Sequence, residues 1–213
     1  MKKILWWALC ALVLQGAAAR AETFSEGVHY VELFQAQPVD TGDKIEVREL
    51  FWYGCPHCYD LEPILNRWLK RLPKDAAFVR MPAVLRPSWA VHARAYYAFE
   101  ALGVTARLHG RLFDAIHRDG RHLDSMEALA EFAAENGVDK KQFIGAFQSF
   151  GVDAALRKAQ ILGRQYEADG VPTLIVDGRY RSTATMAGSH ERLMQVVDFL
   201  IKKARAARRR GDG

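Results

Sequence analysis

The 213-residue sequence contains only three cysteines, and one of them, Cys10, lies in a segment that we expect to be removed. This segment has a basic start at Lys2-Lys3, an apolar run from Ile4 to Leu14 and a small-residue cleavage site at Ala19-Arg20-Ala21, as secretory signal peptides do. The apolar run is too short to span a bilayer as a stable anchor. We therefore predict that residues 1–21 are a signal peptide that is cleaved during export.

The mature chain then keeps a single cysteine pair, Cys55 and Cys58. One close pair cannot supply the disulfide framework that stabilises many small secreted proteins. Stability must instead come from a hydrophobic core, and the 50% apolar composition allows one. The sequence also lacks an internal repeat with a period of roughly 20–50 residues, which argues against a solenoid.

Histidines in a metal-binding spacing are missing as well. The central part of the chain contains four histidines, His92, His109, His117 and His122. None of them belongs to an i, i+4 histidine pair with an acidic neighbour, as zinc-binding helices have. We interpret these residues as surface or core histidines, and we expect no metal site among them.

The most informative stretch is Cys55-Pro56-His57-Cys58, because it lies between two regular elements. Residues 44–52 are rich in β-branched and aromatic side chains, which predicts a strand. Residues 61–72 place apolar side chains at helical spacing, which predicts an amphipathic helix. The cysteine pair is therefore expected where a strand turns into a helix.

This placement has a chemical consequence for the two thiols. At the start of a helix, unpaired N–H groups and the positive end of the helix dipole stabilise an anion. We therefore predict that the pKa of Cys55 is lowered and that Cys55 is the exposed nucleophile, whereas Cys58 is the shielded resolving thiol. Pro56 suits the first helical turn, where its missing N–H is not needed. His57 can stabilise the thiolate as a hydrogen-bond donor or as a cation.

Cys-Pro-His-Cys after an aromatic-rich strand resembles the DsbA family of periplasmic thiol oxidases, which has the thioredoxin fold. The resemblance implies an α/β protein in the periplasm that donates a Cys55–Cys58 disulfide to unfolded secreted proteins with free thiols. It also implies reoxidation by a DsbB-type membrane oxidase, a monomeric state, and no cofactor besides the disulfide. An alternative interpretation is a metal carrier that uses Cys55, His57 and Cys58, although zinc would normally require further ligands.

Two charged residues are expected beneath the motif. By the two-residue period of a strand, Glu49 shares a face with Ile45 and Val47 and is a candidate buried acid. Thioredoxin-like proteins carry an acid at this position, so the resemblance implies that Glu49 exchanges protons with Cys58. Arg80 matches a basic residue that DsbA-like proteins place close to this acid. The alternatives are a water-facing charge for Glu49 and a surface ion pair for Arg80.

A long insertion is expected between the two halves of the fold. Pro172 follows Cys58 by 114 positions, whereas a βαβ unit needs roughly 30 residues. The excess predicts an inserted helical domain over 87–168, which DsbA-like proteins also have, within a thioredoxin-like domain formed by 22–86 and 169–205. Helical periodicity predicts five helices in the insertion, over 89–102, 106–117, 125–136, 140–150 and 154–168.

A second motif, Gly170-Val171-Pro172, opens an apolar run that ends in the hairpin turn Asp177-Gly178. In thioredoxin-like folds the matching X-Pro bond is cis and faces the cysteines. The resemblance therefore implies that Val171 and Pro172 bind a client peptide through their backbone, as an added strand would. We also expect Pro56, next to the nucleophile, to contact the client. The alternative is an ordinary trans proline at the start of a strand.

The C-terminal region is predicted to be a helix over 190–204 followed by a disordered basic tail over 206–213. Residues 202–213 carry six positive side chains and Asp212, a net charge of +5, whereas the rest of the mature chain has a net charge of −3. A body of that sign is not expected to bind nucleic acid. The basic end could contact anionic lipid.

Two further functions stay open from the sequence alone. A disulfide isomerase or reductase of the same fold would share these motifs. Isomerases of this class usually carry a separate N-terminal dimerisation domain, however, and the about 30 residues between the cleavage site and Glu49 are too few for one. A peptide-binding chaperone without redox activity would not need Cys55.

Overall fold

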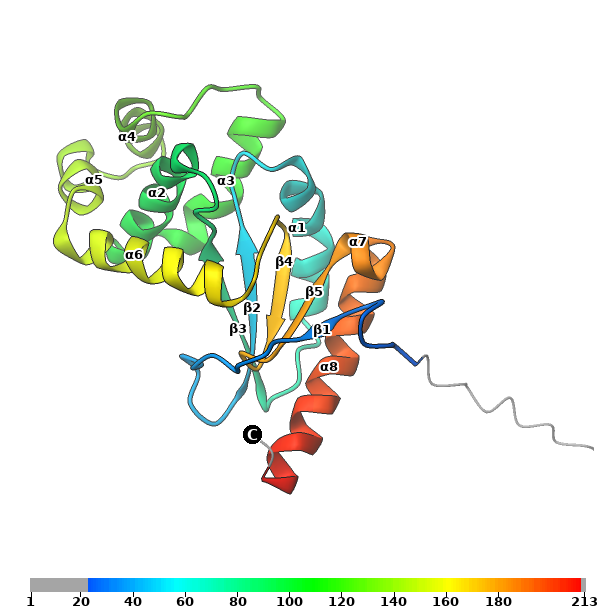
Figure 1. Ribbon diagram of the computed structural model, residues 1–213. Helices are drawn as coiled ribbons and strands as arrows, with labels where there is room; N and C mark the ends of the chain where they lie inside the picture. The colour runs from blue at the N-terminus through cyan, green and yellow to red at the C-terminus, as the bar shows by residue number, and fades with distance from the viewer. Residues whose placement is uncertain (1–22, 212–213) are drawn as a thin grey trace, which may run out of the picture.

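The computed structural model describes residues 23–211. The predicted signal peptide, Cys10 and Asp212 lie outside these residues. The described chain is organised around one five-stranded mixed sheet with the strand order β1-β5-β4-β2-β3 (Figure 1). It is an α/β protein, as predicted.

The sheet is centred on β2, which spans Ile45–Phe51 and is buried along its whole length. β2 pairs in parallel with β3 (Ala76–Pro82) and antiparallel with β4 (Thr173–Val176). β5 (Tyr180–Thr183) pairs antiparallel with β4, and the short β1 (Val31–Glu32) forms the edge. This arrangement brings the chain before the cysteines next to the chain after Pro172.

The turn between β4 and β5 has the geometry predicted from the sequence. Asp177 and Gly178 both adopt positive φ angles, 57° and 63°, and the N–H of Arg179 donates to the carbonyl oxygen of Val176 (3.0 Å), so the two residues form the centre of a tight turn between the strands. A Cβ atom at Gly178 would lie 2.0 Å from the carbonyl oxygen of Gln37, so this position also needs a glycine for space.

Helices cover both faces of the sheet (Figure 1). The helices α1 (Pro56–Leu69) and α8 (His190–Arg210) cover the face that carries Ile45 and Val47, and the short α7 (Ala184–Ala187) precedes α8. Their apolar side chains form one core with the sheet, built from residues such as Leu61, Leu65, Trp68, Val196, Val197 and Leu200.

On the opposite face, α6 (Phe150–Gln165) packs against the sheet. Its contacts join Ala159, Leu162 and the following Tyr166 with residues of three strands (Leu50, Met81 and Ile175). Each side of β2 is thus covered by a helix, which explains why this strand contains no water-facing residue.

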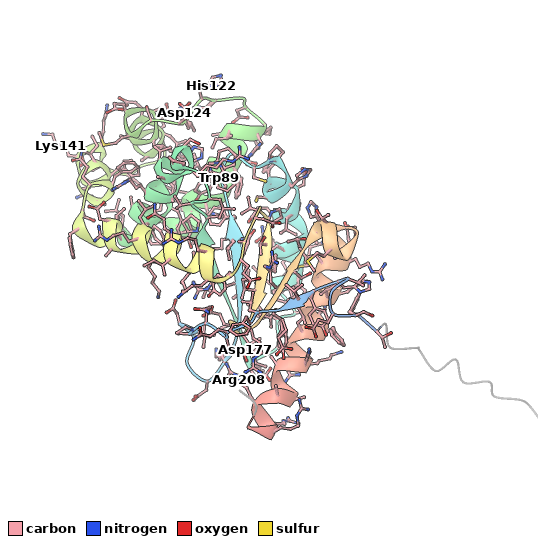
Figure 2. All side chains as sticks on the ribbon, in the orientation of Figure 1. Trp89, His122, Asp124, Lys141, Asp177 and Arg208 are labelled. Carbon is pink, nitrogen blue, oxygen red and sulfur yellow. The ribbon has the colours of Figure 1, made fainter. Side chains whose placement is uncertain are left out.

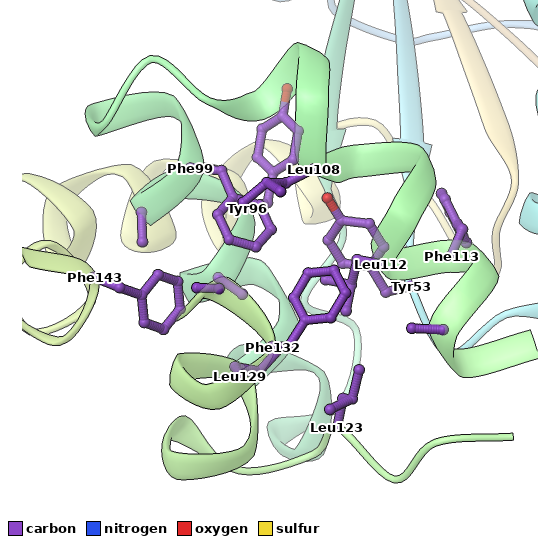
Figure 3. Packing of buried hydrophobic residues seen from close by; sticks show 14 of the residues in the cluster. Tyr53, Tyr96, Phe99, Leu108, Leu112, Phe113, Leu123, Leu129, Phe132 and Phe143 are labelled. Atoms are coloured by element: carbon purple, nitrogen blue, oxygen red, sulfur yellow. The ribbon is translucent and has the colours of Figure 1, made fainter. Parts of the chain in front are cut away.

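The chain between β3 and β4 is helical, as expected for the inserted region. It contains the 3-10 turn η1 and five helices, including α6 described above (η1 Pro87–Trp89, α2 Ala90–Ala101, α3 Thr105–His117, α4 Met126–Glu135 and α5 Lys140–Phe147). An aromatic core holds them together (Figure 3), and Tyr53 from the loop after β2 belongs to it. The inserted region is therefore fastened directly to the loop that carries the cysteines.

The histidines of the insertion occupy both environments that the sequence suggested. His92 and His109 are buried, whereas His122 is exposed on the outer side of the helical region, near Asp124 in Figure 2. The boundary between the last two helices differs from the prediction. α5 ends at Phe147, and α6 starts at Phe150 because Ser149 Oγ accepts a hydrogen bond from the N–H of Val152 (3.2 Å).

The prediction of a disordered basic tail is wrong for residues 206–210, which extend α8 to Arg210. Ala207 is buried, so the helix continues to pack beyond the predicted end. Arg208 Nε donates to Asp177 (3.0 Å), and Arg208 Nη1 donates to the carbonyl oxygen of Asp43 (2.6 Å), which ties the last turns to the base of the sheet (Figure 2). The helix then ends at Gly211, whose φ of 80° is a common helix terminus.

Candidate active site

Cys55 lies at the N-terminus of α1, directly after the loop that follows β2. It is the N-cap residue, and its N–H donates to the carbonyl oxygen of Trp52 (2.9 Å) while its own carbonyl accepts from the N–H of Cys58 (3.1 Å). Pro56 occupies the first helical position. Both cysteines are unpaired thiols, and 8% of Cys55 is exposed compared with 0% of Cys58. Cys58 is therefore shielded, as predicted, whereas the prediction of an exposed Cys55 is wrong: Cys55 is buried and only slightly more accessible than Cys58.

The electrostatics of the two thiols are opposite. The pKa of Cys55 is lowered to about 6, first by a hydrogen bond with the Cys58 thiol and then by the backbone N–H groups of Cys58 and His57, while burial opposes the change. Burial raises the pKa of Cys58 far above its ordinary value, and the neighbouring Cys55 adds to this. At neutral pH Cys55 is therefore mainly a thiolate and Cys58 a thiol.

His57 contributes less to the thiolate than the sequence suggested. Its side chain is exposed at the start of α1, and its ring centroid lies 6.4 Å from that of His190 at the start of α8. The charge of His57 lowers the pKa of Cys55, but the Cys58 thiol and the helix N–H groups come before it. The main stabilising partner of the nucleophile is thus the second cysteine.

The second motif closes over the first, as the resemblance implied. The Val171–Pro172 peptide bond is cis. Cys55 Sγ lies 3.5 Å from the carbonyl oxygen of Val171, although 116 residues separate them in the sequence. Pro172 is buried and Val171 is half-buried, so the backbone of Val171 stands beside the reactive sulfur.

Glu49 is a buried acid beneath the dithiol. None of it is exposed, Arg80 Nε donates to Glu49 Oε2 (3.2 Å), and Glu49 Oε1 has no hydrogen-bond partner among the described residues. Burial raises the pKa of Glu49 to about 8, although the charge of Arg80 opposes this. A negative charge on Glu49 would in turn raise the pKa of Cys58. The carboxyl group therefore titrates near neutral pH and is electrostatically linked to the shielded thiol.

Sequence reasoning missed the rest of this charged group. Arg80 Nη2 donates to Glu62 Oε1 on α1 (3.0 Å), and His109 Nε2 on α3 lies 3.2 Å from the same oxygen. His109 Nδ1 is 2.9 Å from the hydroxyl of Tyr53. Because a carboxylate only accepts, the Nε2–H of His109 donates to Glu62 and the Tyr53 hydroxyl donates to Nδ1.

Burial and neighbouring charges set the protonation states of His109 and Glu62. Burial lowers the pKa of His109, so this ring is neutral. Burial alone would raise the pKa of Glu62, but the hydrogen bond with His109 and the charge of Arg80 lower it. A signal for His109 did exist, since it lies at helical spacing with the apolar residues Leu112 and Phe113. Nothing in the sequence marks Glu62, which lies inside a helix of otherwise ordinary pattern.

The loop before Cys55 depends on a close approach of Gly54 to Trp52. A Cβ atom at Gly54 would lie 2.3 Å from the indole ring of Trp52. That ring stacks on Trp89 with a centroid distance of 4.5 Å and an interplanar angle of 6°. Glycine at position 54 therefore lets an aromatic pair cover the loop that presents the nucleophile.

A cavity of about 670 Å³ opens beside the cysteines and is bordered by His57, Val171 and Pro172.

Within residues 23–211, no group of three or more His, Cys, Asp or Glu side chains is arranged to hold a metal ion. No helix of this part of the chain is long and apolar enough to cross a membrane.

Comparison with known proteins agrees with this geometry. The family model of the DSBA-like thioredoxin domain matches residues 46–199. The thiol:disulfide interchange protein DsbA of Pseudomonas aeruginosa is 41% identical over 208 residues, which cover 97% of this chain and 99% of the relative. The protein of the same name from Azotobacter vinelandii is 42% identical and is covered completely.

Solved structures give the same result. The crystal structure of Pseudomonas aeruginosa DsbA superposes with a TM-score of 0.83 at 42% identity and covers 87% of this chain and 97% of that one. The crystal structure of the oxidoreductase DsbA from Xylella fastidiosa has a TM-score of 0.78 at 35% identity over 84% of this chain and 96% of that one. The chain therefore belongs to the DsbA family of DSBA-like thioredoxin-domain proteins.

Proposed function

We propose that this thiol:disulfide oxidoreductase donates a Cys55–Cys58 disulfide to unfolded proteins that have been exported to the periplasm. The observation that carries the proposal is the asymmetry of the thiols: the pKa of Cys55 is lowered to about 6, and burial raises that of Cys58. A low thiol pKa makes Cys55 a good leaving group and stabilises the reduced enzyme, which favours the transfer of the disulfide to a client.

The reaction consists of two exchange steps. A client thiolate attacks Cys55 Sγ of the oxidised enzyme, the Cys55–Cys58 bond breaks, and Cys58 leaves as a thiolate that takes up a proton. A second client thiolate then attacks the client sulfur of the mixed disulfide, and Cys55 leaves as a thiolate. The client dithiol is oxidised to a disulfide, and the enzyme disulfide is reduced to the dithiol.

The other site residues receive roles in these steps. Glu49 supplies the proton to Cys58 and accepts it again on reoxidation, because its pKa of about 8 lies near neutral pH. His57 supports the Cys55 thiolate. The backbone of Val171, beside Cys55 Sγ, pairs with the client, and Pro56 and Pro172 line the contact. A membrane oxidase of the DsbB type would reoxidise the enzyme.

Two assays test the proposal. Oxidised wild-type protein, mixed with a reduced unfolded protein that contains cysteines, should form client disulfides, and Cys55→Ala should form none. The Cys55–Cys58 pair, equilibrated with reduced and oxidised glutathione, should stay mainly reduced over most glutathione ratios. A pair that is instead oxidised by small amounts of glutathione disulfide would indicate a reductase or isomerase of the same fold.

A further inference from the structure

The cavity beside Cys55 lies where a client bound to the active site would extend. It shares His57, Val171 and Pro172 with the reaction centre, so a client held on Cys55 Sγ and paired with Val171 would lie against its walls. This step rests on the proposed function. The side chains of the wall opposite Val171 would then contact the client and affect which clients bind.

The far wall is formed by β5, α7 and the start of α8. On β5, Tyr180 and Ser182 are buried in one direction, while Arg181 and Thr183 line the cavity in the other. Ile175, the β4 residue paired with Arg181, packs under α6. Arg181 thus lies just beyond the area of the sheet that the helix covers.

Arg181 is desolvated without being fully paired. Only 15% of its side chain is exposed, and its Nε atom is buried with no hydrogen-bond partner among the described residues. Among residues 23–211, the one carboxylate within 4 Å of its guanidinium is that of Asp169, at 3.6 Å from Nη1 and with 87% of its side chain exposed. By contrast, Arg48 holds Asp40 at 2.8 Å.

An arginine in this condition favours a further acceptor. A guanidinium presents several N–H donors in one plane and binds a carboxylate through two of them. Leaving a donor of a charged group unpaired is unfavourable. Because Nε is buried, a ligand carboxylate would reach Arg181 through its Nη atoms, where Asp169 makes only a long contact, and would pair with it more closely than Asp169 does. The remaining carboxylates of the cavity, on Asp169 and Glu191, are exposed, so water and salt screen their repulsion of an acidic ligand.

We propose that Arg181 binds a carboxylate side chain of the client and so makes the enzyme favour cysteines with a nearby aspartate or glutamate. Asp169 holds Arg181 weakly from the solvent side and competes with the client for it. The substrate class is therefore an unfolded segment with an acidic residue a few positions from its cysteine. Arg181 acts as a specificity-determining residue, and the sulfur chemistry stays with Cys55 and Cys58.

The test compares peptides that contain one cysteine and differ only by Glu against Gln. An extended client advances about 3.3 Å per residue, so the variable position is scanned over about four places on each side of the cysteine. The readout is the rate at which each peptide forms a mixed disulfide with the oxidised mature protein. At the best position, wild type should favour the Glu peptide by about tenfold, which corresponds to about 1.4 kcal/mol.

Two variants should move this ratio in opposite directions. Arg181→Gln should bring the Glu-to-Gln ratio close to one, whereas Asp169→Asn should raise it by roughly two- to threefold because the competitor is removed. Arg179→Gln is the matched control, since Arg179 precedes the same strand, is half-buried and does not line the cavity. It should keep the wild-type ratio.

The outcomes that overturn the proposal are distinct from failure of the proposed function. A ratio of one at every position in wild type, or an equal loss of selectivity in Arg179→Gln, would show that Arg181 does not select clients. If Arg181→Gln fails to fold, an unchanged or lower ratio in Asp169→Asn contradicts the proposal on its own. Wild-type protein that cannot oxidise even uncharged dithiothreitol would instead refute the oxidase function.

Discussion

Two groups of charged residues are centred on buried side chains on opposite faces of β2, and they behave differently. The Glu49 cluster lies beneath the dithiol and consists of Glu49, Arg80, Glu62 and His109. The Arg48 cluster lies under α6 and consists of Arg48, Glu46, Asp40 and Lys158. Each takes charged residues of the same strand out of water, but Asp40 and Lys158 are exposed, whereas all members of the Glu49 cluster are largely buried. Exposure is therefore one difference between the two clusters, and the balance of charge is another.

The balance of charge differs between the two clusters. In the Arg48 cluster two cations face two carboxylates, the contacts are 2.8 Å for Arg48 Nη2–Asp40 and for Lys158 Nζ–Asp40, and the pKa of Asp40 is lowered first by its hydrogen bond with Lys158. In the Glu49 cluster, Arg80 is the one cation facing the two carboxyl groups of Glu49 and Glu62, because His109 is neutral. One carboxyl group must therefore hold a proton near neutral pH, and burial selects Glu49. The charge-balanced cluster fixes structure, whereas the buried cluster with unbalanced charge can exchange protons.

The largest expected effect comes from breaking the balanced cluster. Arg48→Met leaves the buried Glu46 carboxylate without its cation and should lower the free energy of unfolding by about 3–5 kcal/mol. Arg80→Met is the matched variant, and it removes the cation from one ionised carboxylate, Glu62, which keeps its hydrogen bond with His109. It should be less destabilising than Arg48→Met, which removes the cation from Glu46 and also one partner of Asp40, because Glu49 holds a proton. Urea denaturation of both variants measures this, and an equal or larger loss in Arg80→Met would show that the two clusters are energetically alike.

The next effect tests the proton exchange itself. Glu49→Gln keeps the shape of the side chain but cannot deliver a proton to Cys58, and it should slow the reduction of the enzyme disulfide by roughly 10²-fold. Glu46→Gln makes the same change on the other face of β2 and should leave this rate unchanged while lowering stability. Stopped-flow measurement of mixed-disulfide formation gives these rates. Equal rates in Glu49→Gln and wild type would show that Glu49 does not deliver the proton to Cys58.

The sequence made much of this arrangement predictable, and the reasons are physical. The strand before Cys55, the helix after it and the cis Val171–Pro172 bond follow from local patterns and from the family resemblance, and the structure confirms each. Glu49 was identified because a strand has a two-residue period and a carboxylate interrupts an apolar face. Such signals are local, so they survive without knowledge of the tertiary contacts.

The partners of these residues could not be predicted in the same way. Glu62 and His109 are 47 positions apart, and Arg208 reaches Asp177 across 31 positions. A basic C-terminal run has the composition of a disordered tail. Its helical state depends on contacts such as that of Arg208 with Asp177 in the β4–β5 turn, which the sequence pattern does not show. The Arg48 cluster was missed for a similar reason, because a strand with Glu46 and Arg48 on one face looks half-exposed until α6 is placed over it.

A third prediction concerns the pH dependence of stability. The pKa of Glu49 is about 8 in the folded chain and ordinary, near 4.5, in the unfolded chain. Between these values the folded state holds more protons, so this group makes stability fall as pH rises, by at most about 1.4 kcal/mol per pH unit. Asp40 has the opposite sign: its lowered pKa gives stability that is lost only as pH falls below about the ordinary aspartate pKa of 3.8.

The measurement uses a Cys55→Ala background, in which the thiolate no longer titrates. Urea denaturation between about pH 4.5 and pH 8 is compared with and without the added Glu49→Gln change. His92 and His109, whose pKa values burial lowers, contribute to both curves in the same way. The stability of the parent relative to that of the Glu49→Gln variant should fall across this window, and the acid limb, which depends on Asp40, should be the same in both. Parallel curves for the two proteins would mean that Glu49 is ionised throughout, which contradicts the charge-balance argument.

The smallest effect separates the partners of the Cys55 thiolate. Its pKa is lowered mainly by the Cys58 thiol, then by helix N–H groups, and least by the charge of His57. Cys58→Ala removes the first partner and should raise the pKa of Cys55 clearly, whereas His57→Ser should raise it by less. The pH dependence of alkylation or of thiolate absorbance gives both midpoints. A larger shift in His57→Ser would mean that the exposed imidazole, and not the shielded thiol backed by the Glu49 cluster, controls the nucleophile.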